Sequence, residues 1–134
     1  MLTQPRLSPE LARGVLTSAA KLSGDYEKSQ VLTALVKQHP VDAQEYLKAV
    51  ARISGDYERS NALRALMKTG KLDGAAQVEV IQQARHLGDY EAAQVLVELS
   101  RTSPLTAGAR REYENAAEHL GDYSRKQVLA ALSR

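Results

Sequence analysis

The stretch GDYEKSQVLTAL at residues 24–35 decides the fold, because close copies of it occur three more times along the chain. The copies read GDYERSNALRAL at 55–66, GDYEAAQVLVEL at 88–99 and GDYSRKQVLAAL at 121–132. Gly, Asp, Tyr and two Leu positions are shared by all four, and successive copies begin 31, 33 and 33 residues apart. An internal period of this length predicts an array of helix pairs, since propeller blades need about 40 residues or more.

Each copy has the features of a helix start. The aspartate is expected to be the N-cap, its carboxylate accepting hydrogen bonds from free backbone N–H groups of its own helix. The preceding glycine is expected to adopt the left-handed conformation that closes the previous helix. Downstream, apolar residues such as Leu32 and Leu35 recur at helical spacing and predict a buried stripe. We therefore assign structural roles to Gly24, Asp25, Tyr26, Gly55, Asp56, Tyr57, Gly88, Asp89, Tyr90, Gly121, Asp122 and Tyr123.

The segment before each glycine predicts a partner helix, again from apolar residues at helical spacing. Ser-Pro pairs at 8–9 and 103–104 suggest helix starts, with Ser as the cap and Pro at the first helical position. Breaks near Pro40 and Asp42, and near Gly70 and Asp73, separate successive units. The expectation is one α-helical domain over 1–134, built of units at approximately 8–37, 40–68, 73–101 and 103–134.

Composition excludes several classes of protein. The 134 residues carry a net charge of +2, with both signs spread along the chain, so a strongly basic nucleic-acid binder is not indicated. The absence of Cys excludes disulfide scaffolds, thiolate zinc sites and thiol nucleophiles. No apolar run approaches the ~18 residues of a membrane span, and the first residues lack the apolar core of a secretory signal. A soluble protein without membrane insertion is expected; the compartment stays open.

Units of 31 to 33 residues carrying Asp-Tyr-Glu and then Leu-x-x-Leu resemble the HEAT-like α-solenoid repeats of bacterial proteins, over residues 8–134. Similar repeats occur in uncharacterised bacterial proteins and beside sensor metallopeptidases of the β-lactamase-regulator type. The resemblance implies an all-α, right-handed superhelical solenoid of four antiparallel helix pairs with a binding role; it does not imply an activity. The metallopeptidase signature His-Glu-x-x-His is absent from this chain. Tetratricopeptide repeats have a similar period, but their Trp, Gly, Tyr and Pro pattern does not match.

The recurring tyrosine and the amide four residues after it allow two interpretations. The tyrosines either plug the joints between units or form an aromatic row along a groove. The amides either brace the interior or form a polar rail that holds a peptide backbone. We favour the structural interpretation of both, because a residue repeated in register normally serves the repeat interface. The amides are Gln30, Asn61, Gln94 and Gln127.

No active site is visible in the sequence. His39 lies in a predicted loop, and His86 and His119 belong to different units, so no set of zinc ligands converges. There is no Gly-x-Ser-x-Gly elbow and no phosphate-binding glycine loop. We therefore expect no enzyme activity, no metal and no cofactor.

Positions that vary between units are the candidates for partner binding. Counting back 11, 7 and 3 residues from each glycine predicts an exposed stripe on the first helices: Arg13, Thr17, Lys21, Gln44, Lys48, Arg52, Gln77, Ile81, Arg85, Arg110, Glu114 and Glu118. An ordinary solvated surface is the simplest interpretation of such a stripe. The candidates within it for docking an acidic segment are Lys21, Lys48, Arg52 and Arg85.

These observations favour a noncatalytic scaffold that binds a protein or peptide, within a larger protein or assembly. The alternatives are a nucleic-acid-binding solenoid and a regulatory appendage of an enzyme; acidic residues in every unit weigh against nucleic acid. Leu129 and Leu132 lie on a final helix that no polar helix caps, so self-association through this end is also expected.

Overall fold

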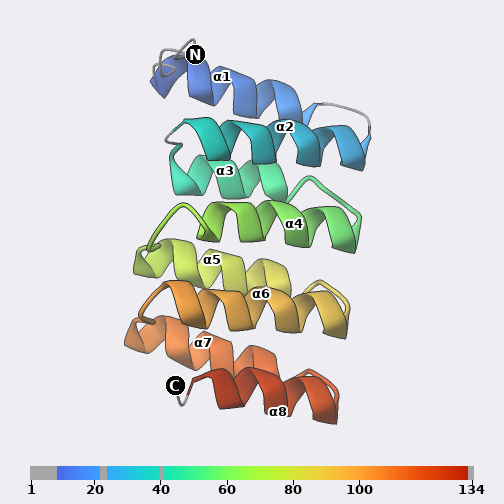
Figure 1. The fold of residues 1–134 in the computed structure, drawn as a ribbon, viewed down its shortest axis with the longest axis vertical. Helices are drawn as coiled ribbons and strands as arrows, with labels where there is room; N and C mark the ends of the chain where they lie inside the picture. Colours follow the sequence, from blue (N-terminus) through green and yellow to red (C-terminus); the bar gives the residue numbers. More distant parts are fainter. Residues whose placement is uncertain (1–8, 22–23, 40, 133–134) are drawn as a thin grey trace.

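The computed structural model describes residues 9–21, 24–39 and 41–132, and over these residues the chain is helical and contains no strand. The all-α prediction is therefore confirmed for the described part. In chain order (Figure 1) the helices are α1 (Pro9–Ala20), α2 (Asp25–Gln38), α3 (Ala43–Val50), α4 (Asp56–Met67), α5 (Gly74–Ala84), α6 (Asp89–Thr102), α7 (Ala107–Glu118) and α8 (Asp122–Ala131). The sequence predictions for Ser8, Leu22 and Pro40 lie outside the described residues.

The helices form two layers. The even-numbered helices lie side by side in chain order, α2 against α4, α4 against α6 and α6 against α8 (Figure 1). The odd-numbered helices form the second layer in the same order, and α1, α3, α5 and α7 each contact the helix that follows them. Helices equivalent in the sequence repeat are thus neighbours in space.

One continuous hydrophobic core runs between the layers. The predicted stripe of the even helices is buried at Leu32, Leu63 and Leu96, and the odd helices contribute Leu47 and Ile81. The apolar pattern before Gly24 also predicts Leu11 on the buried face of α1, but Leu11 is exposed. Because the core is shared by successive helices, each unit buries its apolar residues against its neighbours as well as within itself.

Helices α3, α5 and α7 begin with side-chain caps. Asp42 accepts a hydrogen bond from Glu45 N at 3.0 Å, and Asp73 accepts one from Ala76 N at 2.9 Å. The predicted start at Ser103-Pro104 is wrong, since α7 begins at Ala107. Ser103 instead ends α6, and its buried hydroxyl accepts a hydrogen bond from the backbone N–H of Leu72 at 2.9 Å.

The glycine and the aspartate of each Gly-Asp pair have other roles than those predicted. Gly24, Gly55, Gly88 and Gly121 are themselves the N-caps, with extended backbone at φ values from −102° to −62°, so the left-handed conformation and the aspartate cap are both wrong. The carboxylates accept from the next unit's glycine instead: Asp25 from Gly55 N at 2.7 Å, Asp56 from Gly88 N at 2.9 Å and Asp89 from Gly121 N at 2.8 Å. We call these three contacts the aspartate ladder. It fixes the register in which the even helices stack.

Neighbouring carboxylates leave little room for a side chain at Gly55 and Gly121. A Cβ atom at Gly121 would lie 3.0 Å from Asp89 Oδ2, and one at Gly55 would lie 3.3 Å from Asp25 Oδ2 and closer still to Glu58 Oε1 of its own helix. Glycine is therefore used here for close approach rather than for an unusual φ. Hydrogen bonds from the backbone N–H groups of Ser54 and Gly55 lower the pKa of Asp25 below its ordinary value of 3.8, because they favour its charged form.

Candidate binding surfaces

The stripe predicted on the first helices is interrupted in the structure. Ile81 and Gln77 are buried, whereas Lys21, Lys48, Arg52 and Arg85 are exposed. The Gln77 amide donates to Leu72 O at 2.8 Å and to Pro104 O at 2.9 Å, and its oxygen accepts from Thr106 N at 3.1 Å. Gln77 thus connects α5 to the segment before α7, and the third unit offers no surface stripe.

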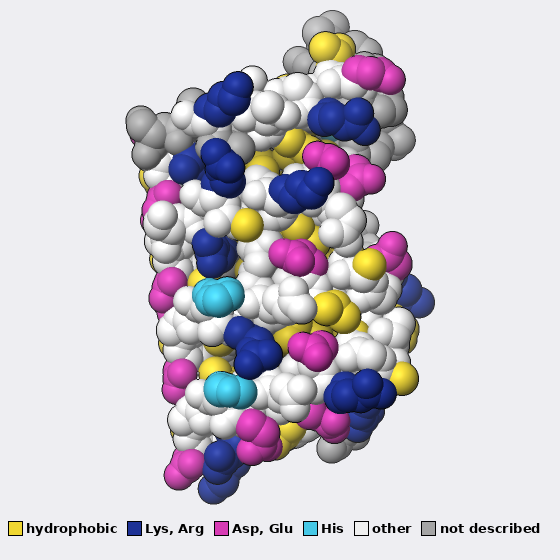
Figure 2. All heavy atoms as spheres, turned by 180° about the vertical axis from the view of Figure 1, so that it is seen from behind, with side chains coloured by type: hydrophobic (Ala, Val, Ile, Leu, Met, Phe, Trp, Pro, Cys, Tyr) yellow, Lys and Arg dark blue, Asp and Glu magenta, His cyan; other side chains and the backbone are white. Residues whose placement is uncertain are grey.

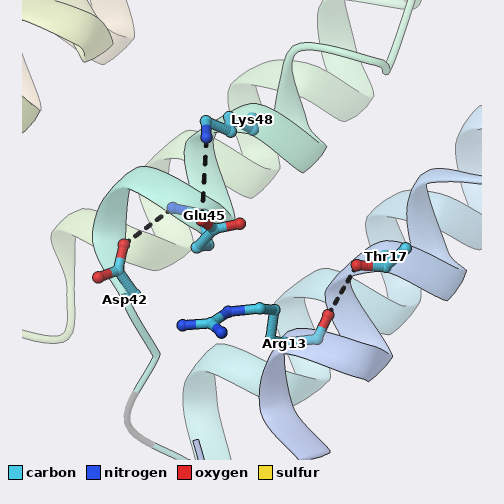
Figure 3. A network of polar contacts seen from close by, with 5 residues as sticks. All are labelled: Arg13, Thr17, Asp42, Glu45 and Lys48. Atoms are coloured by element: carbon cyan, nitrogen blue, oxygen red, sulfur yellow. Dashed lines mark hydrogen bonds and ion pairs between the residues drawn. The ribbon is translucent and has the colours of Figure 1, made fainter. Parts of the chain in front are cut away.

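Three of the four candidate cations come together. Lys21, Lys48 and Arg52 line a cavity of about 300 Å³ between α1 and α3, and Arg85 is not among its residues. Glu45 lies in the same lining, and its Oε1 is 3.8 Å from Lys48 Nζ. Figure 3 shows this pair beside Asp42, the N-cap of α3. The cavity therefore carries both signs of charge.

The whole face of the odd helices has the same mixed character. Figure 2 shows acidic and basic side chains intermingled along it, with small apolar areas between them. Arg110 and Glu114 on α7 pair at 3.7 Å, and both side chains are half exposed. An alternation of this kind is typical of a solvated surface and does not select for one sign of ligand.

The recurring tyrosines lie on the opposite layer and are exposed. Tyr26, Tyr57, Tyr90 and Tyr123 keep 65, 66, 69 and 81% of their surface, so the prediction that they plug the joints between units is wrong. Their common position near the start of the even helices, in the register that the aspartate ladder sets, makes them neighbours along the layer. They form the aromatic row that was the alternative interpretation.

Two other tyrosines fill the interior. Tyr46 and Tyr113 are fully buried, and their hydroxyls donate to Ala62 O at 2.8 Å and to Val128 O at 2.7 Å. Each hydrogen bond joins an odd helix to the even helix that follows it. Burial raises the pKa of Tyr46, and it raises that of Tyr113 to about 12 although a hydrogen bond with the Ser100 side chain opposes the shift.

The recurring amides belong to the same outer face as the tyrosine row. Gln30 and Gln127 are exposed and Asn61 and Gln94 are half-buried, so the prediction of internal bracing is wrong. Gln94 Nε2 donates to Tyr90 Oη at 2.9 Å, an exposed contact between the two rows. An amide row on an accessible helix face can pair with a polypeptide backbone, because each amide offers both donors and acceptors.

A third row on this face was missed by the sequence interpretation. The residue thirteen positions after each glycine is basic, and Lys37, Lys68 and Arg101 are exposed near the ends of α2, α4 and α6. The spacing from tyrosine to amide to cation is i, i+4 and i+11, which is one face of a helix. Extending the comparison of the twelve-residue copies by two residues would have found it. We call the tyrosine, amide and cation rows together the even-helix face.

No converging ligand set is present in the described part of the chain. Within residues 9–21, 24–39 and 41–132 no three His, Asp or Glu side chains are grouped so that they could hold a metal ion. His119 Nδ1 lies 2.9 Å from Asn115 O in its own helix, and His86 is exposed. None of the described helices combines the length and apolar character that crossing a bilayer requires.

No family model, curated protein or solved structure matches this chain. The assignment of a function therefore rests on the residues and their geometry.

Proposed function

We propose that the chain is a HEAT-like α-solenoid of four helix pairs in a right-handed superhelix, and that it serves as a noncatalytic scaffold binding a protein or peptide. The layering of equivalent helices and the aspartate ladder support the solenoid. The proposed units approximate the four pairs α1–α2, α3–α4, α5–α6 and α7–α8.

We place the binding site on the even-helix face. Four large aromatic side chains stand exposed in register, although burying such rings is among the larger sources of binding energy available to a protein. The fold does not use these rings in its core, where Tyr46 and Tyr113 serve instead. A row of aromatic rings with an amide row beside it fits an extended polypeptide, with rings against side chains and amides against backbone.

Selection from a random peptide library tests this proposal. We expect peptides to enrich on the intact protein, and a fluorescein-labelled selected peptide to lose at least tenfold in affinity with Tyr57→Ser and Tyr90→Ser combined. The matched control is Lys48→Ser with Arg52→Ser on the odd-helix face, which should leave binding unchanged. If no peptide enriches, or if only the control variant loses affinity, the even-helix face is not the binding surface.

A further inference from the structure

A cleft lined by cations lies between α2 and α4 on the even-helix face. Two adjoining cavities, of about 250 and 590 Å³, share Lys37, Ala65 and Lys68 in their linings. Arg64 lines the smaller cavity together with Gln30 and Asn61 of the amide row. Neither lining contains an Asp or Glu residue. Positive charge is therefore concentrated here, whereas the cavity between α1 and α3 also contains Glu45.

The cations of the cleft have no acidic partner among the described residues. The ion pairs of the described part of the chain are Lys48–Glu45, Arg110–Glu114 and Arg125–Asp122, all outside the cleft. Arg64 Nε is buried and has no hydrogen-bond acceptor. An anionic oxygen placed in the cleft would receive charge-assisted hydrogen bonds from the ammonium and guanidinium groups that line it.

The equivalent positions on α6 differ, with Val97 in place of Arg64 and Glu98 in place of Ala65. Ala65 lies ten residues after Gly55, and the residue ten after Gly88 is Glu98. Because equivalent helices stack in register, Glu98 lies on the side of α6 that faces α4, as Ala65 lies on the side of α4 that faces α2. A carboxylate thus lies beside the cation row between Lys68 and Arg101. This arrangement fits a short acidic segment better than a nucleic acid, whose phosphates require a sustained basic track.

We infer that the cleft between α2 and α4 binds carboxylate side chains of an extended acidic peptide through Lys37, Arg64 and Lys68. This inference rests on the proposed function and specifies its partner by charge. Neighbouring helix axes are about 8–10 Å apart. A chain in the extended polyproline II conformation advances about 3.1 Å per residue with about three residues per turn, so carboxylates three residues apart lie on one face and can reach Lys37 on α2 and Lys68 on α4. The amides of Gln30 and Asn61 lie in the same lining and can pair with the peptide backbone.

The test uses a fluorescein-labelled peptide with Glu at every third position in a Gly-Ser background, and the same peptide with Gln in place of Glu. Fluorescence anisotropy should show binding of the Glu peptide that weakens as NaCl is raised, and no binding of the Gln peptide. Arg64→Gln should weaken binding at least tenfold, because it removes one of the three cations that line the cleft. Lys126→Gln, an equal change of charge at an exposed site on α8, should change affinity less than twofold.

An isosteric pair separates charge from folding. Ala65→Glu adds to this cleft the carboxylate that Glu98 has at the equivalent position of α6, and Ala65→Gln has the same size without the charge. We expect Ala65→Glu to bind the Glu peptide at least tenfold more weakly than Ala65→Gln at equal urea midpoints. Should the two urea midpoints differ, the exposed pair Lys37→Gln and Lys68→Gln replaces this comparison, with the same tenfold loss expected.

Equal binding by the wild type and Arg64→Gln, or tighter binding of a single-stranded oligonucleotide than of the Glu peptide, would overturn the inference. If library peptides bind the tyrosine row but the Glu peptide does not bind, the acidic partner is wrong and the scaffold proposal stands. If neither binds, both are wrong.

Discussion

The buried tyrosines of this chain belong to its core, whereas the exposed tyrosines are available for contact with a partner. Tyr46 packs between α3 and α4 with its hydroxyl bonded to Ala62 O, while Tyr57, at the start of α4, keeps two thirds of its surface exposed. The same residue type is therefore a core component in one position and a contact surface in the other. The difference lies in which face of its helix each ring occupies.

Substitution at these two positions should separate the roles. Tyr46→Ala should lower the free energy of unfolding by about 3–5 kcal/mol through lost burial and the cavity left behind, and Tyr46→Phe by about 1 kcal/mol through the lost hydrogen bond. Tyr57→Ala should stay within about 0.5 kcal/mol of the wild type. Urea unfolding followed by circular dichroism measures all three. A large loss with Tyr57→Ala would show that the exposed ring stabilises the joint after all.

Burial also makes stability depend on alkaline pH. Tyr113 has a pKa of about 12 in the folded chain and an ordinary value of 10.0, so the folded state holds the proton more tightly than the unfolded state. The resulting stabilisation is complete below pH 10, and it is lost as the pH rises from 10 to about 12. Between these values Tyr113→Phe should lose stability less steeply than the wild type in urea titrations. Identical slopes would contradict a buried, protonated hydroxyl.

At the scale of the helices, the aspartate ladder joins one unit to the next. Asp89 reaches across to Gly121 N, whereas Asp122, the last aspartate of the series, pairs with Arg125 of its own helix at 3.0 Å. The same residue in the same sequence context therefore has an inter-unit contact in one case and a local one in the other. Asp122 is a natural control for the ladder.

Removing a step of the ladder should weaken the stack. Asp89→Ala should lower the free energy of unfolding by roughly 1 kcal/mol, because it takes the acceptor from a backbone N–H at the joint. Asp122→Ala removes only an exposed ion pair and should change stability by less than about 0.5 kcal/mol. Thermal and urea unfolding of the two variants provide the comparison. Equal losses at the two positions would mean that the inter-unit contact has no special contribution.

At the scale of the whole molecule, the continuous core predicts cooperative unfolding. Buried residues from Leu16 to Val128 form one cluster, so no helix pair has a core separate from that of its neighbours. Urea transitions followed by helical circular dichroism and by tyrosine fluorescence should coincide. Tyr46→Ala should move both transitions together. Two separate transitions would show that the ends of the stack unfold independently, as nearest-neighbour arrays allow.

Much of the fold could be predicted from the repeated phrase. Helical periodicity places Leu32, Leu63 and Leu96 in the core, and the apolar segments before each glycine predict the odd helices. The candidate surface could be predicted only in part. The tyrosines and amides were recognised as rows. Repetition alone could not tell whether a row is buried between helices or exposed on the surface, because buried and exposed positions recur with the same period. Gln77 was expected on the surface and is instead buried, where hydrogen bonds to Pro104 and Thr106 satisfy its side-chain amide.

The sequence by itself determined that this chain is helical, that its helices recur every 31 to 33 residues, and that the stripe including Leu32, Leu63 and Leu96 is buried. Only the tertiary structure decided that Asp25, Asp56 and Asp89 bond to the next unit, that the four recurring tyrosines are exposed, and that Arg64 lies in a cleft with Lys37 and Lys68. The physical reason is the distance along the sequence over which each kind of interaction acts. Periodicity and capping act within a single helix, whereas the ladder, the exposed rings and the cation cleft depend on how one helix is seated against another some 30 residues away.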